Sequence, residues 1–177
     1  MIFAKKSMDE LERDSIASFQ AKNKTPILLI ADNIRSAMNV GSLFRTADAF
    51  GIEAIYLCGY TPCPPQREIL KTALGSTESV HWIYFEKIED AIEHCKSTHV
   101  ICALEQTHAS TPLHEFQCKE PVALILGNEV HGVSDVALER SNHALEITQF
   151  GTKHSLNVAV SAGIALFHLS TCHHFKS

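Results

Sequence analysis

The 177-residue sequence predicts an α/β domain with a mostly parallel sheet flanked by helices. Apolar runs of strand length alternate with helical segments, and this alternation is typical of parallel strands joined by helical crossovers. The composition agrees, because 45% apolar and 20% charged residues suit a globular chain with a sizeable core. We therefore expect one main domain over residues 25–177, preceded by a short helical extension over residues 1–24.

Local signals support each element of the N-terminal half. A Ser-Met-Asp-Glu capping-box pattern at residues 7–10 predicts a short helix in the extension. The continuous apolar run at 27–31 predicts a strand buried on both faces. A helix over 39–50 is expected because Gly51 follows it. The next expected elements are a strand at 54–58, a turn-rich segment at 59–65 and a short helix at 67–73.

The C-terminal half continues the alternation. We expect a weak strand at 81–84, a helix at 87–96, strands at 100–104 and 122–126 separated by a long loop, a helix at 134–140 and a strand at 144–147. The chain then enters the stretch 151–169, whose front is polar and whose tail from Val158 to Leu169 is apolar. Such a tail is typical of a helix packed against a sheet.

Cysteine and histidine usage limits the classes of protein to consider. Six scattered cysteines, several in apolar segments, favour thiols in a reducing compartment over a disulfide framework. Eleven histidines raise the question of zinc, but neither paired Cys-x-x-Cys elements nor His-Glu-x-x-His occurs, so we expect no metal. No apolar run approaches the ~20 residues of a membrane helix, and the first residues lack a signal-peptide pattern. A cytoplasmic protein with no membrane partner is expected.

The distribution of charge matters more than the net charge of −5. Residues 86–146 carry four Lys/Arg against eleven Asp/Glu, whereas residues 1–80 carry nine of each. Local clustering governs phosphate binding more than the total does. A neutral-to-basic face can therefore coexist with an acidic back.

Three predicted strands end in polar, glycine-containing segments, at residues 104–107, 126–129 and 147–151. In open parallel sheets, ligands bind beyond the carboxyl ends of the strands. These three loops are expected to form one pocket.

The stretch 32–47, at the end of the first strand, holds Asn39 and Arg45 at the start of a helix. A helix N-terminus attracts anions, so Arg45 could clamp a phosphate there. The alternative is an N-capped helix with a surface arginine. These residues alone leave both readings open.

Two further stretches contain reactive side chains. Gly127 to Gly132 places Glu129 between two glycines without forming a Rossmann or P-loop pattern, and Glu129 alone is equally typical of a helix cap or surface charge. Gly151 to Ser155 resembles a helix start capped by Ser or Thr. A nucleophilic Ser155 is disfavoured, because the Gly-x-Ser-x-Gly elbow of hydrolases is missing.

In combination and order, the three stretches resemble the signature motifs of the SpoU (TrmH-like) RNA ribose methyltransferases of the SPOUT superfamily. The resemblance covers about residues 26–170, and Ser155-Leu156-Asn157-Val158 is its most specific part. It implies an α/β fold with a C-terminal deep trefoil knot, a homodimer, S-adenosylmethionine (AdoMet) bound in the knot, and methyl transfer to a ribose 2′-hydroxyl of tRNA or rRNA.

The resemblance also implies roles for individual residues. The implied cofactor contacts are Leu104, Gly127, Asn128, Ile147, Gln149 and Leu156. The implied catalytic set is Arg45, with Asn39 beside it, supported by Glu129, Ser155 and Asn157. A guanidinium is a poor proton acceptor, so we expect Arg45 to orient a phosphate and stabilise the developing alkoxide. The arginine helix of one protomer is expected to face the cofactor of the other, with the apolar tail 158–169 shared between them.

Contacts to RNA are expected from exposed cations. The expected residues are Arg35, Arg67, Lys71 and Lys153, with Lys5, Lys6, Lys22 and Lys24 as a possible extension of the same track. For each residue the alternative is a solvated surface charge.

One position departs from the family pattern. Val130 stands where glycine commonly follows the glutamate, and a branched residue disfavours positive φ, so we expect the loop to take a different path. Two alternative functions remain open: a catalytically inactive knotted RNA-binding protein, and an α/β enzyme such as a nucleotide-binding transferase without an RNA partner.

Overall fold

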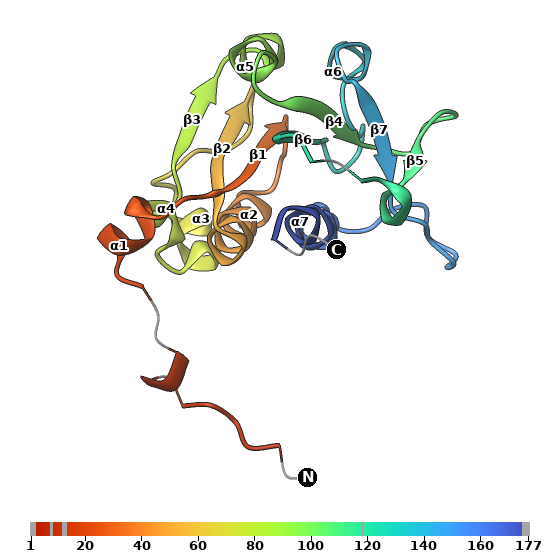
Figure 1. The fold of residues 1–177 in the computed structure, drawn as a ribbon. Helices are drawn as coiled ribbons and strands as arrows, with labels where there is room; N and C mark the ends of the chain where they lie inside the picture. Colours follow the sequence, from red (N-terminus) through yellow and green to blue (C-terminus); the bar gives the residue numbers. More distant parts are fainter. Residues whose placement is uncertain (1–2, 8, 12–13, 118, 175–177) are drawn as a thin grey trace.

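The sheet is parallel throughout the part of the chain that the structure describes. That part, in this computed structural model, comprises residues 3–7, 9–11, 14–117 and 119–174. The strands are β1 (Thr25–Asp32), β2 (Ile52–Cys58), β3 (Trp82–Phe85), β4 (Val100–Leu104), β5 (Thr111–Pro112), β6 (Val122–Leu126) and β7 (His143–Glu146). They lie in the order β3-β2-β1-β6-β4-β7-β5 (Figure 1).

Helices cover both faces of this sheet. They are α1 (Ile16–Ala21), α2 (Ala37–Phe50), α3 (Arg67–Ala73), α4 (Ser76–Ser79), α5 (Ile88–Cys95), α6 (Asp135–Glu139) and α7 (Val158–His174), with short 3-10 turns η1 (Asp9–Leu11) and η2 (Leu113–Glu115). Helices α2, α3 and α7 lie on one face, and α5 and α6 lie on the other (Figure 1). The predicted architecture of a parallel sheet between helical layers is confirmed.

The alternation of side chains along β1 explains why both faces are covered. Leu29 points into the cluster formed with α2 and α7, whereas Leu28 and Ile30 point into the cluster formed with α5 and α6. Because successive strand residues face opposite sides, a continuous apolar run must be buried twice. Leu29 and Ile30 are fully buried, which is the burial expected from the sequence.

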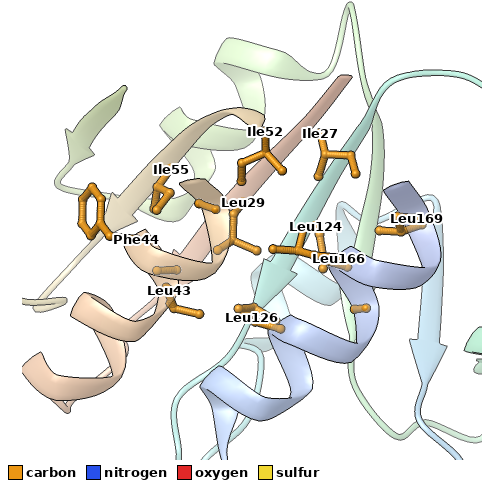
Figure 2. Close-up of a cluster of buried hydrophobic side chains, with 14 of the residues drawn as sticks. Ile27, Leu29, Leu43, Phe44, Ile52, Ile55, Leu124, Leu126, Leu166 and Leu169 are labelled. Carbon is orange, nitrogen blue, oxygen red and sulfur yellow. The ribbon is translucent and has the colours of Figure 1, made fainter. Parts of the chain in front are cut away.

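Helix α7 is anchored on the sheet by its apolar inner face. Figure 2 shows Leu166 and Leu169 of α7 beside Leu124 and Leu126 of β6, with Leu43 of α2 in the same cluster. Burial of each of these leucines contributes about 1.5–3 kcal/mol to the stability of the fold. This packing returns the C-terminal segment from β7, near one edge, to the centre of the sheet.

The strand order brings three distant loops together. β6 lies between β1 and β4, and β4 in turn pairs with β7, so β6, β4 and β7 are neighbours. Parallel strands end at the same edge, and the loops that follow these three strands therefore share it.

Some expected boundaries differ from the structure. The extension is divided into η1 and α1, and the Ser7–Glu10 capping box forms in both directions, at 2.6 Å (Ser7 N to Glu10 Oε2) and 3.4 Å (Glu10 N to Ser7 Oγ), while Met8 lies outside the described residues. The four-residue α4 and the two-residue β5 fall in segments with no predicted element. In the described residues, no helix combines the length and apolar character needed to cross a bilayer.

Candidate active site at the strand ends

A cavity of about 710 Å³ opens at the carboxyl ends of β6, β4 and β7. Its walls come from the loops after these strands and from the segment that enters α7. The structure thus brings the three predicted loops together in one pocket. All six residues expected to contact a cofactor line the cavity: Leu104, Gly127, Asn128, Ile147, Gln149 and Leu156.

The lining combines apolar walls with carboxylates. Leu104, Ile147 and Leu156 are its expected apolar members, and they are joined by Leu126 and Leu145. Carboxyl groups come from Glu105, Glu129, Asp135 and Glu146, whereas none of the described lining residues is lysine or arginine. This environment suits a ligand that joins a flat ring system to a cationic group.

The loop after β6 owes its shape to two glycines. A Cβ on Gly127 would overlap the backbone of Gly132 and Val133, so only glycine allows this close approach. Asn128 and Gly132 form a two-way backbone bridge, with both N···O distances at 2.9 Å. Positive φ occurs at Gly132 (71°) and not at Val130, whose side chain is 63% exposed. The valine is therefore accommodated without strain, because the turn takes its left-handed residue two positions later.

The Asn128 side chain anchors this loop to the rest of the domain. Its Nδ2 donates to the Asn33 carbonyl and to the Tyr60 hydroxyl, both at 2.7 Å. Its Oδ1 accepts from the amides of Val130 and His131 at 2.9 and 3.0 Å. These bonds occupy the side-chain amide, and the bridge to Gly132 already uses the backbone N–H and C=O, so Asn128 acts in the cavity wall mainly as an anchor.

Glu105 is a structural member of the site that residue-by-residue reasoning missed. Its carboxylate accepts from the amides of Gln106 and Val133, both at 2.9 Å, and therefore ties the β4 loop to the β6 loop. Gln106 Nε2 donates to the His154 carbonyl at 2.9 Å, which ties the β4 loop to the entry of α7. The sequence predicts a strand-end loop here, but no local pattern indicates that Glu105 bonds to Val133 or that Gln106 bonds to His154.

A chain of hydrogen bonds joins all three motif stretches. Asn39 Nδ2 donates to Glu129 Oε1 at 2.8 Å, and Asn157 Nδ2 donates to Asn39 Oδ1 at 3.1 Å. The Glu129 carboxylate also accepts from the amides of Arg35 (2.8 Å) and Ser36 (3.1 Å). Three residues expected in the catalytic set are thus held in one network beside the cavity.

The network lowers the pKa of Glu129. Burial by itself raises the pKa of this carboxyl, but the bonds from the Arg35 amide, the Asn39 side chain and the Ser36 amide outweigh it. The pKa of Glu129 therefore lies below its ordinary value of 4.5, and the carboxyl group is ionised at neutral pH.

The start of α2 is bonded to other groups of the protein. Ser36 caps the helix by accepting from the Asn39 amide at 3.3 Å, and the Glu129 carboxylate occupies the amides just before it. The protein itself supplies the anion at this terminus. Arg45 is exposed further along α2, so its expected contact with a phosphate stays a prediction. A shallower hollow of about 340 Å³ lies beside it, lined by Arg35, Ser36, Asn39 and Glu129.

The third stretch differs from its expected helix start. Helix α7 begins at Val158, and Asn157 caps it by accepting from the amides of Ala159 (2.9 Å) and Val160 (3.4 Å). The expected Ser or Thr cap is therefore wrong. Ser155 instead lines the cavity, together with Leu156 and Asn157.

The expected cations lie outside the cavity. Arg45 is exposed on α2, and Arg35, Arg67, Lys71 and Lys153 are also exposed. Of the N-terminal lysines, Lys22 pairs with Asp14 at 2.6 Å, and the Lys24 ammonium lies 3.2 Å from the centre of the Phe19 ring. These two are thus engaged within the extension, whereas Lys5 and Lys6 are exposed.

The fold and the site define a class of protein: a parallel α/β protein whose ligand cavity is built from strand-end loops and closed by the return of the chain into its last helix. The family assignment agrees, because the sequence model of the SpoU rRNA Methylase family matches residues 26–167, and the chain belongs to this family.

Named relatives and solved structures give the same picture. The chain is 27% identical over 89% of its length to the 23S rRNA (guanosine-2′-O-)-methyltransferase RlmB of Vibrio parahaemolyticus, and 29% identical over 82% to the tRNA (guanosine(18)-2′-O)-methyltransferase of Aquifex aeolicus. It covers 64% and 69% of these proteins, so it spans about two thirds of the length of such relatives. The AdoMet-bound rRNA methyltransferase of Sinorhizobium meliloti superposes with a TM-score of 0.79 and 26% identity, over 90% of this chain and 61% of that one.

Proposed function

We propose that this protein transfers the methyl group of AdoMet to a ribose 2′-hydroxyl of tRNA or rRNA. The observation that carries the proposal is the network Glu129–Asn39–Asn157, because it joins three motif stretches at the mouth of one cavity. Membership of the SpoU family and the 2′-O-methyltransferase names of its relatives support it.

The cavity suits AdoMet in size and chemistry. Its volume of about 710 Å³ lies in the range of small-molecule sites. Leu104, Ile147 and Leu156 offer apolar surface for the adenine faces, and the carboxylates offer partners for the cofactor's positive charge. When bound, AdoMet supplies a methyl group that is already electrophilic because it sits on a sulfonium.

The surrounding residues would position the ribose. Glu129, Asn39 and Asn157 are fixed by mutual hydrogen bonds, so the hollow beside them presents a preorganised polar wall to a hydroxyl. Arg45 would orient the adjacent phosphate and stabilise the developing alkoxide. The proton of the 2′-hydroxyl would pass to that phosphate or to a transiently neutral arginine.

We propose that Arg45 acts in the site of a second copy. It is exposed and does not line the cavity of its own chain. Helix α7 carries a stripe of exposed apolar residues, Val160, Ile164 and Phe167, at helical spacing opposite its buried face. A homodimer that buries this stripe would remove it from water and bring α2 towards the partner's cavity.

The path of the C-terminal segment supports the family's trefoil knot as part of the proposal. After β7 the chain passes the β4 loop, where Gln106 bonds to His154, and then returns beneath β6 and β1 as α7. We place the protein in the cytoplasm, where RNA substrates occur and where the thiols of Cys58, Cys63, Cys95 and Cys172 stay reduced.

A methyl-transfer assay tests the function directly. Purified protein with labelled AdoMet and total tRNA or rRNA fragments should incorporate label and block alkaline cleavage at one linkage, because a 2′-O-methyl group removes the attacking hydroxyl. Incorporation without protection would refute the 2′-O assignment. Mapping 2′-O-methyl sites in RNA from a strain lacking the gene would then identify the nucleotide.

The inactive RNA-binding alternative makes a different prediction. It predicts no AdoMet binding by calorimetry, whereas the complete set of Arg45, Asn39, Glu129, Ser155 and Asn157 favours a working enzyme. Family membership disfavours the second alternative, an unrelated transferase without an RNA partner.

A further inference from the structure

We propose that Tyr60 and Tyr84 form a rigid platform on which bases of the RNA stack, next to the reaction site. This inference rests on the proposed function and adds a recognition surface to it. The two rings lie at the carboxyl end of β2 and in β3, and neither lines the AdoMet cavity.

Tyr60 exposes its ring while its hydroxyl is held inside. Tyr60 is 60% exposed, but its hydroxyl accepts a 2.7 Å hydrogen bond from Asn128 Nδ2, and Asn128 is only 6% exposed. The Tyr60 amide also donates to Asn33 Oδ1 at 3.2 Å. Because the amide and the hydroxyl are both bonded to the protein, the exposed part of Tyr60 is its ring.

Tyr84 is held in the same manner beside it. Tyr84 is 48% exposed, and its hydroxyl donates to the Gly59 carbonyl at 3.0 Å. Gly59 directly precedes Tyr60, so both rings belong to one small area of the sheet edge. Because both polar tips are satisfied within the protein, the exposed part of each residue is its apolar ring.

The platform adjoins the site through Asn128. That residue lines the cavity with the β6 loop and holds Tyr60 with its side chain. Arg35 is exposed and lines the hollow beside Glu129, and it follows by two residues Asn33, which accepts from the Tyr60 amide. A cation for phosphate therefore lies on the same loop that holds Tyr60. Stacking on aromatic rings with a nearby arginine is how proteins hold unpaired RNA bases. Nucleotides flanking the target ribose are the occupants that fit this place.

The rings are also preorganised. A free surface tyrosine loses rotamer entropy when a base stacks on it, whereas these two are already fixed by their hydroxyls. The hydrogen bonds therefore lower the cost of binding without reading sequence, and the platform should tolerate different bases.

Ring-removing and ring-retaining variants separate stacking from structural support. The probe is a short adenylate oligoribonucleotide containing 2-aminopurine, whose fluorescence falls when it stacks. We expect Tyr60→Leu and Tyr84→Leu each to weaken binding about tenfold, with the salt dependence of the affinity unchanged. Tyr60→Phe and Tyr84→Phe should weaken binding by at most about threefold, because the ring remains and only its fixation by the hydroxyl is lost. As a matched contrast, Lys71→Ala should lower the log–log salt slope by about 0.7.

The outcomes distinguish this inference from the proposed function. Wild-type protein that binds and methylates RNA, with both leucine variants binding equally well, would overturn the platform alone. A phenylalanine variant as weak as its leucine counterpart would also overturn it, because the hydroxyl anchor and not the ring would then matter. An equal loss of AdoMet affinity in Tyr60→Leu would show that Tyr60 merely supports Asn128. Wild-type protein that binds no RNA would refute the proposed function and the platform together.

Discussion

Replacing Gly127 by alanine tests how the cavity is built. The new Cβ would overlap the backbone of Gly132 and Val133, which no side-chain rotation can relieve. The loop after β6 must therefore open. Opening breaks the two-way bridge between Asn128 and Gly132, which is part of the cavity wall.

The magnitude follows from the broken bonds. The bridge has two backbone hydrogen bonds of 2.9 Å, and each contributes about 1 kcal/mol net. Opening the loop therefore lowers the free energy of unfolding by about 2 kcal/mol. If the open loop cannot hold the cofactor, AdoMet must re-form the overlapped closed loop, and the apparent affinity falls at least about tenfold. Any overlap that persists would appear as a further loss of about 1–3 kcal/mol in the free energy of unfolding.

The assay is calorimetric titration of AdoMet, with urea unfolding in parallel. Gly151→Ala is the matched control, because a Cβ on Gly151 meets nothing within 4 Å although it lies between β7 and α7. The control should bind AdoMet within about twofold of wild type. If Gly127→Ala binds AdoMet as tightly as the control does, the close approach of the two glycines does not shape the cofactor site.

Three further predictions address the remaining site residues. Arg45→Ala should lower methyl transfer at least about 100-fold while leaving AdoMet affinity unchanged. If the arginine acts across the dimer, mixing this variant with Gly127→Ala should restore part of the activity. No restoration would mean that Arg45 acts in the site of its own chain. Phe167→Glu should yield monomers in sedimentation velocity at micromolar concentration, because this 62% exposed ring belongs to the proposed dimer face; an unchanged dimer would move the interface elsewhere. For Glu129 the folded pKa lies below the ordinary 4.5, so the stability it contributes is present above that value and is lost as pH falls through the folded pKa. The free energies of unfolding of wild type and Glu129→Gln, measured in urea, should differ by a constant amount near neutral pH and converge in acid. A difference that stays the same at every pH would contradict this role of the charge.

The apolar strands show what local pattern can predict. β4 and β6 occupy Val100–Leu104 and Val122–Leu126, the ranges expected from their apolar runs. Their residues face helices on both sides, so burial demands apolar side chains at every position. The pattern failed for β5, because Thr111–Pro112 is a strand only through its pairing with β7.

Helix starts were less predictable than strands. Ser155 and Thr152 are good caps by type, yet Asn157 caps α7. The same Asn157 side chain also donates to Asn39, which lies 118 residues away. The helix start is therefore set by a tertiary hydrogen bond to Asn39 as well as by local capping preference.

The sequence by itself determined the fold class and the strand-end loops, because burial and close backbone approach leave direct marks on composition. Its resemblance to the SpoU family implied six of the residues that line the cavity. Only the tertiary structure decided how these residues are used. Glu129 accepts hydrogen bonds from the amides just before α2, more than ninety residues earlier in the chain, and β6 inserts between β1 and β4 to bring the motif loops side by side. Hydrogen-bond partners of that kind depend on strand order, and strand order is set by long-range packing that no local pattern records.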